Sequence, residues 1–215
     1  MVTFNERIHQ IASFVQVHLN EMALKYPTHE HDLAYRWEHT LRVTQYGHTI
    51  AKAEGANVEQ VVVACLLHDV AHFESDDDYQ SHGRRGAQVS IPLLKEMGYS
   101  PAQVDDITYS IAVHVDGDAG YQHEATLGAK VVSDADNIDR FGTYRILQWC
   151  VPEMDEFDKL CEKLSKRIQR LEQYRERNPL ETSTGRALFD RQLERQIAFF
   201  NDLIGEHRLT VLLEI

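Results

Sequence analysis

One apolar run in the sequence ends in three residues whose side chains can bind metal. Residues 61–67 read Val-Val-Val-Ala-Cys-Leu-Leu, and His68, Asp69 and His72 follow closely. Burying unpaired polar groups is unfavourable, whereas a divalent ion would compensate the charge of a buried carboxylate and accept imidazole nitrogen as a ligand. The alternative is a helix cap or an ion pair, because a cationic His is favoured at a helix C-terminus. Further donors elsewhere in the chain would favour the metal.

Two other segments supply such donors. His39 lies inside a helical pattern, where a lone histidine is usually a core residue bonded to a carbonyl group. Asp136 lies in the acidic stretch 133–139, which also follows an apolar run. On a helix Asp136 and Asp139 share a face while Asp134 points elsewhere, so one carboxylate can face the bundle while another caps or orients a ligand. Four donors on three separated helices form a more specific pattern than any one of them.

Apolar residues at three- and four-residue spacing predict that helices position these donors, so the expected fold class is all-α. The predicted helices cover residues 4–25, 33–54, 58–67, 82–97, 101–114, 124–139, 143–150, 155–177 and 183–207. The acidic segment 73–81 is predicted to be a polar loop over the site. The last two helices form a predicted hairpin over residues 155–207, which packs on the bundle or on a second subunit, so a homodimer is one expectation.

Composition limits the other functions of the chain. Its 215 residues are 43% hydrophobic and 26% charged, which fits one globular domain over residues 1–215. The net charge of −12 argues against binding to extended nucleic acid or to anionic membranes. Three cysteines without a CxxC pattern predict free thiols in a reducing compartment. No apolar run approaches the ~18–20 residues that span a bilayer, so the expected location is the cytoplasm.

Three motifs together resemble the HD superfamily of metal-dependent phosphohydrolases. They are Glu38-His39-Thr40, Leu66-Leu-His-Asp69 and Asp134-Ala-Asp136. The resemblance extends over about residues 35–142 and includes His82, with Gly86-Ala87 on the same helix, and His114. It implies an HD-domain helical bundle in which His39, His68, Asp69 and Asp136 hold a divalent metal ion. Such ligands suit Mn, Fe, Co, Ni or Zn, with Mg as a further candidate, and the sequence does not select among these metals.

The resemblance also implies catalytic roles. A metal-activated water would attack phosphorus in line while the ion neutralises a phosphate oxygen. Asp69 would orient that water, and His72 would act as general acid or bind phosphate, with a helix cap as the alternative for His72. The residues predicted to bind the substrate phosphates are His82, Arg84, Arg85, His114, Lys130 and Arg140. His82 and His114 have a second interpretation, in which Asp69 bridges to them and they complete a second metal position.

The expected substrate is a small phosphorylated molecule, a nucleotide whose phosphoester or phosphoanhydride bond is cleaved. Nucleoside or deoxynucleoside triphosphates come first by resemblance, and a cyclic-nucleotide phosphodiesterase or a nucleoside monophosphatase would use the same core. A different class of function is a metal-stabilised regulatory or binding module whose C-terminal hairpin is the partner surface. In a third interpretation the histidines are structural, and then no metal binds.

Overall fold

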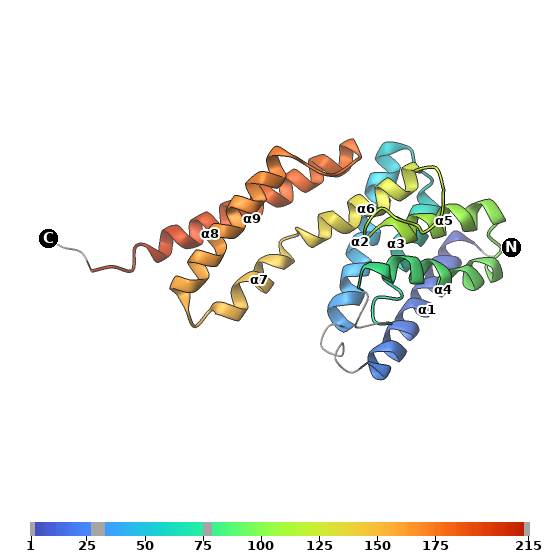
Figure 1. Cartoon of the computed structure of the whole chain (residues 1–215), viewed down its shortest axis with the longest axis horizontal. Helices are drawn as coiled ribbons and strands as arrows, with labels where there is room; N and C mark the ends of the chain where they lie inside the picture. The colour runs from blue at the N-terminus through green and yellow to red at the C-terminus, as the bar shows by residue number, and fades with distance from the viewer. Residues whose placement is uncertain (1–2, 27–32, 75–78, 213–215) are drawn as a thin grey trace. The chain divides into compact units, whose positions relative to one another are not determined.

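The computed structural model describes residues 3–26, 33–74 and 79–212, and within these ranges every regular element is a helix (Figure 1). Residues 75–78 of the predicted polar loop lie outside the described ranges. The α-helices are α1 (Phe4–Lys25), α2 (Leu33–Glu54), α3 (Val58–Leu67), α4 (His82–Glu96), α5 (Pro101–Val113), α6 (Leu127–Arg140), α7 (Tyr144–Cys150), α8 (Phe157–Glu176) and α9 (Ser183–His207). Short 3₁₀ helices cover Tyr79–Ser81 and Val151–Glu153. The predicted all-α fold class is confirmed.

Local sequence signals account for most helix ends. Asn57 caps α3 by accepting a hydrogen bond from the backbone N–H of Gln60, and Ser100 forms a capping box before Pro101 opens α5. α6 begins at Leu127, three residues later than predicted from the apolar pattern. The Thr126 hydroxyl accepts a hydrogen bond of 3.1 Å from the N–H of Ala129, which defines the start of the helix there.

The α3 helix forms the centre of the N-terminal core. Every residue from Val61 to Ala71 is buried, and α3 packs against α1, α2 and α5. Gly47 permits the close approach of α2, because a Cβ at this position would overlap the Sγ of Cys65. Because α3 is apolar and surrounded by other helices, the polar residues that directly follow it also lie in the interior.

The chain divides into two compact units. The first consists of Met1–Asp139 with Glu181–Gly185, and the second of Arg140–Leu180 with Arg186–Ile215. Thr182 belongs to the first unit: its backbone N–H and its hydroxyl donate to the Asp134 carboxylate over 2.8 and 2.7 Å. The prediction that the 215 residues form a single domain stays a prediction.

In the second unit, α8 and α9 lie side by side as an antiparallel hairpin (Figure 1). Asp158 near the start of α8 contacts His207 at the end of α9, with 2.8 Å between Oδ1 and Nε2. The buried side chains of this hairpin include Leu160, Leu164, Leu171, Phe189, Leu193 and Phe200. The predicted C-terminal hairpin is therefore present. None of the described helices combines the length and apolar character needed to cross a membrane.

Candidate metal centre

Four buried donors from three parts of the fold meet in the first unit. His39 comes from α2, His68 and Asp69 follow the end of α3, and Asp136 comes from α6. The Nε2 atoms of His39 and His68 are 3.3 Å apart, and they lie 3.4 and 3.2 Å from Asp69 Oδ2. His39 Nε2 is also 3.2 Å from Asp136 Oδ1. The structure therefore brings together the four residues that the sequence predicts as metal ligands.

The spacing and the hydrogen bonding of these donors fit a divalent ion. Neighbouring ligands at about 2.1 Å from an octahedral ion are roughly 3 Å apart, close to the separations found in this cluster. His68 Nδ1 donates to the Cys65 carbonyl oxygen over 2.7 Å, and His39 Nδ1 donates to Asp139 Oδ2 over 2.7 Å. When the two rings are neutral, their Nε2 lone pairs then point into the cluster. The cluster can hold a divalent metal.

The pKa values of the cluster show that it favours a cation. Burial alone would raise the pKa of Asp69, but Arg36 and His68 hold it well below its usual range. Burial likewise opposes ionisation of Asp136, yet hydrogen bonding to His39 lowers the pKa of this carboxyl. Burial would lower the pKa of His39, whereas Asp136 and Asp139 raise it well above 6.5. Carboxylates that favour a proton on His39 would also favour a divalent ion.

Asp139 contacts the Nδ1 atom of His39, whose Nε2 atom faces the cluster. Besides accepting from His39, its carboxylate accepts from Arg42 Nε at 2.6 Å and from Arg42 Nη2 at 3.2 Å. Burial would raise the pKa of Asp139, but the hydrogen bonds from His39 and Arg42 lower it. The sequence indicated that Asp139 shares a helix face with Asp136, but Asp139 was not among the predicted site residues. Its spacing of three from Asp136 was the available signal.

A second group of histidines lies against the other oxygen of Asp69. Asp69 Oδ1 is 3.0 Å from His82 Nε2, 3.6 Å from His114 Nε2 and 3.7 Å from His72 Nδ1. His82 and His114 meet because α4 packs closely on α5 at Gly83, where a Cβ would lie 2.8 Å from the carbonyl oxygen of Ala112. His114 Nδ1 donates to a backbone carbonyl, so its Nε2 faces Asp69. Asp69 is thus shared by two clusters of donors.

Arg36 is a site residue that the sequence analysis missed. Its Nη1 donates to Asp69 Oδ2, and its Nη2 donates to His72 Nε2 over 2.7 Å. Burial lowers the pKa of His72 to about 4, so the ring is neutral near pH 7 and Nε2 accepts this hydrogen bond. Arg36 precedes His39 by three residues, which places both on one face of α2. That spacing was the only sequence signal for Arg36.

Two of the cations predicted to bind phosphate pair with acidic residues of the first unit. Arg84 Nη1 lies 3.0 Å from an Asp116 oxygen and donates to the Asp118 carbonyl oxygen over 2.7 Å. Lys130 Nζ is 3.2 Å from Glu181. These contacts compete with phosphate binding.

The other two cations are placed differently. Arg85 donates to the hydroxyl of Ser81. Arg140 opens the second unit, whereas the cluster lies in the first. The phosphate-binding roles of the four cations stay predictions.

Comparison with known proteins identifies the domain. The HD domain family model matches residues 36–140. A predicted HD superfamily hydrolase from an uncultured Thermotogales bacterium is 22% identical with a TM-score of 0.62, and the match covers 91% of this chain and 92% of that one. An HD-superfamily hydrolase from Bacillus thuringiensis is 18% identical with a TM-score of 0.65, covering 97% and 100%. Bacillus subtilis YpgQ, solved in complex with ADP, is 20% identical with a TM-score of 0.61, covering 94% and 96%. A search of curated proteins finds no match.

The family match spans all four donors of the cluster, and these solved structures share the helical fold over more than nine-tenths of the chain. The HD domain and the His/Asp cluster together support a metal-dependent hydrolase. The resemblance predicted from the three motifs is thereby confirmed: residues 36–140 of the chain match the HD domain, and the chain shares its fold with solved HD-superfamily hydrolases.

Proposed function

We propose that the protein is a metal-dependent phosphohydrolase whose ion is held by His39, His68, Asp69 and Asp136. The observation that carries the proposal is the spacing of 3.2–3.4 Å between buried imidazole nitrogens and carboxylate oxygens. Two imidazoles and two carboxylates leave positions open on a six-coordinate ion. Such an ion, when bound, supplies an acidified water and neutralises a phosphate oxygen.

Residues of the chain would perform the remaining steps. Asp69 contacts both clusters, so it is placed to orient the attacking water. The Arg36 guanidinium lies beside Asp69 and His72, and its planar fork suits two oxygens of one phosphate. A phosphate bound there would raise the pKa of the neutral His72, which could then give a proton to the leaving group.

The second cluster offers two arrangements that differ in metal content. His82 and His114 can bind a phosphate oxygen beside a single ion. Alternatively, with Asp69 as a bridge, they complete a second metal position, and the approach of Asp69 Oδ1 to His82 at 3.0 Å is compatible with it. Metal analysis separates the two arrangements, because they predict about one and about two ions per chain.

The substrate class proposed is a nucleotide, with cleavage of a phosphoanhydride in a nucleoside or deoxynucleoside triphosphate. The support is the HD resemblance together with the ADP complex of Bacillus subtilis YpgQ, which shares the fold. A cyclic-nucleotide phosphodiesterase or a nucleoside monophosphatase would use the same ligands. A regulatory module would bind metal and nucleotide without cleaving a bond.

The experiment is elemental analysis of the purified protein, followed by a phosphate and pyrophosphate release screen over nucleotides with and without Mn²⁺. His68→Ala removes a proposed ligand, and His48→Ala removes an exposed histidine of α2 as the matched control. Release that requires metal, persists in His48→Ala and disappears in His68→Ala supports the hydrolase. Bound metal without release from any nucleotide would favour the module, and failure of the wild-type protein to bind any added metal would refute the site.

A further inference from the structure

The second unit contains a cavity with a strongly basic lining. This cavity, of about 350 Å³, lies along α8. Its lining includes Trp149 and five basic residues of that helix, Lys159, Lys163, Lys166, Arg167 and Arg170. Cavities of this size are large enough for a small ligand. What the cavity can bind therefore depends on how many of these five positive charges are neutralised by acidic side chains.

Acidic side chains neutralise only one end of the lining. Glu153 lies 2.7 Å from Lys163 Nζ and 4.0 Å from Lys159 Nζ, and Glu156 adds a contact of 3.3 Å to Lys159. The remaining acid of the lining, Glu162, forms no ion pair within 4.0 Å among the described residues. The lysines near the start of α8 are thus paired.

The other three residues, Lys166, Arg167 and Arg170, form what we call the α8 cation cluster. In the part of the chain that the structure describes, no carboxylate oxygen lies within 4.0 Å of their nitrogens. Lys166 and Arg170 are exposed, whereas Arg167 is half-buried. Three neighbouring positive charges without a carboxylate repel one another, and a bound anion would relieve that repulsion.

The excess of positive charge is clearest at Arg167. Its guanidinium lies 4.8 Å from the ring centroid of Trp149 and 4.9 Å from that of Phe141, and its Nε is buried without a hydrogen-bond partner. Burial, together with the nearby charge of Arg170, lowers the pKa of Arg167 to about 10. Arginine nevertheless stays protonated at neutral pH. The aromatic rings hold the guanidinium in place beside the cavity, and none of the described carboxylates forms an ion pair with it.

The distribution of charge over the chain also favours an anionic ligand at the second unit. The first unit has nine basic and 22 acidic residues, whereas the second has 13 basic and 12 acidic residues. The first unit therefore carries all of the net negative charge, and the second unit has a net charge of +1. An anionic ligand is repelled much less by the second unit, where the α8 cation cluster lies.

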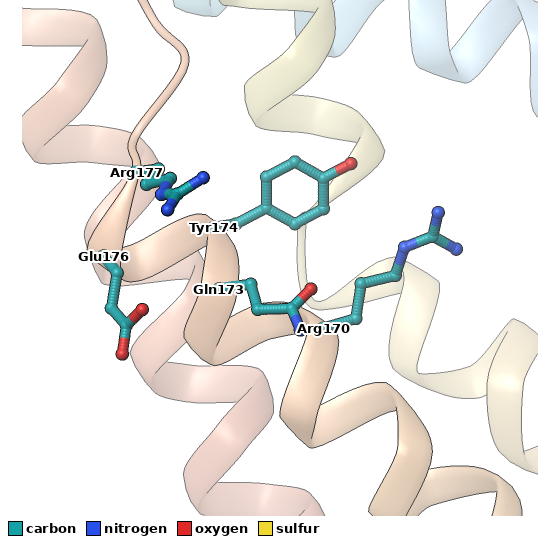
Figure 2. A pocket seen from close by; sticks show the side chains of 5 residues that line it. All are labelled: Arg170, Gln173, Tyr174, Glu176 and Arg177. Carbon is teal, nitrogen blue, oxygen red and sulfur yellow. The ribbon is translucent and has the colours of Figure 1, made fainter.

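The basic lining continues along the helix. Arg170 also lines a neighbouring cavity of about 480 Å³, together with Gln173, Tyr174, Glu176 and Arg177. In Figure 2 the side chains of Arg170 and Tyr174 extend on the same side of α8, while Glu176 points away from them. A ligand longer than a single phosphate could therefore contact Arg170 from either cavity.

We propose that the α8 cation cluster is a second ligand site, which binds the di- or triphosphate group of a free polyphosphate or of a nucleotide. Guanidinium groups match phosphate oxygens in geometry and charge, and the lysine ammonium adds a further donor. No bond is broken at this site. The proposal therefore goes beyond the phosphohydrolase function and does not depend on it.

The test is calorimetric titration of the full-length protein in EDTA, at fixed ionic strength, with pyrophosphate, tripolyphosphate and ADP as three separate ligands. EDTA prevents metal-dependent binding at the His/Asp cluster. Arg170→Gln and Lys166→Gln change exposed residues, so both variants keep the apolar core. Arg175→Gln is the matched control, because Arg175 lies on the same helix, pairs with Glu172 at 3.5 Å and lines neither cavity.

The expected result is about one ligand per chain, with affinity reduced about tenfold or more in Arg170→Gln and Lys166→Gln and unchanged in Arg175→Gln. Binding of ADP alone would identify a nucleotide as the source of the phosphates, and binding of all three ligands would show that the polyphosphate suffices. The proposal is overturned if none of the ligands binds or if all three variants bind equally. Loss of binding in His68→Ala, with retention in Arg170→Gln, would also overturn it by placing the anion at the metal cluster.

Discussion

Replacing Asp139 by Asn should weaken metal binding even though Asp139 is not a proposed ligand. The carboxylate accepts hydrogen bonds from His39 Nδ1 and from Arg42 Nε, so both of its neighbours are donors. An amide has only one acceptor oxygen. If that oxygen faces His39, the amide N–H groups face the N–H groups of Arg42, and two sets of donors cannot form a hydrogen bond. If the amide turns over, it donates to His39 Nδ1, and the ring proton then lies on Nε2, where the ion should bind.

The expected loss follows from this conflict. Residues that orient a metal-bound histidine typically contribute about 10–100-fold to metal affinity, which corresponds to about 1.4–2.7 kcal/mol. Competition titration of Mn²⁺ against a fluorescent chelator measures this loss directly. Circular dichroism on the same samples would show that the helices persist.

Asp134→Asn is the matched control on the same helix. Asp134 is buried and accepts hydrogen bonds from the backbone of Glu181 and from Thr182, but it contacts none of the proposed ligands. This variant should lower the unfolding free energy by about 1–3 kcal/mol while Mn²⁺ affinity stays within about twofold. Unchanged affinity in Asp139→Asn, or equal losses of affinity in both variants, would refute the assigned role of Asp139.

Three further outcomes follow from the structure. Gly185→Ala should lower the unfolding free energy by about 1–3 kcal/mol, because its Cβ would lie 2.6 Å from Thr182 Oγ1. Gly205→Ala should instead raise it by up to about 1 kcal/mol, because among the described residues nothing outside the adjacent backbone of α9 lies within 4 Å of the new methyl group; urea titrations that give both variants the same sign would contradict this. Mn²⁺ affinity should rise by up to about tenfold per pH unit until pH passes the raised His39 pKa, because a proton must leave the ring before the ion binds; affinity that is constant between about pH 6 and 8 would be inconsistent with this coupling. Mn²⁺ at 100 times its Kd should stabilise the folded protein by about 2.7 kcal/mol, and EDTA should reverse the rise in melting temperature; a melting temperature indifferent to both additions would argue for purely structural histidines.

The sequence predicted the fold well where its signals are local. Asn57 and Ser100 cap helices by contacts within three residues, and the apolar pattern of α3 already indicated a buried helix ending at His68. Such signals depend on neighbours in the chain, so they can be read without knowledge of the packing. The start of α6 was less accurate, because the apolar pattern does not show that the Thr126 side chain begins the helix.

The candidate site was predictable only in part. His39, His68, Asp69 and Asp136 stand out because polar groups are rare in apolar helical surroundings. Arg36 does not stand out, since an arginine near a helix start is usually solvated, and its contact with Asp69 spans 33 positions in the sequence. The phosphate-binding predictions for Arg84, Arg85, Lys130 and Arg140 rest on charge alone. Charge alone does not reveal that Arg84 pairs with Asp116 in the folded chain.

The most direct test of the metal-dependent site is a crystal structure of the protein grown with Mn²⁺, with data collected at a wavelength where manganese scatters anomalously. The proposed site predicts an anomalous peak among His39 Nε2, His68 Nε2, Asp69 Oδ2 and an Asp136 oxygen, at about 2.0–2.3 Å from each. A second peak between Asp69 Oδ1 and His82 would establish the two-metal arrangement. The proposed site would be contradicted if manganese were bound in the crystal only at other positions while His39 and His68 contacted only protein atoms.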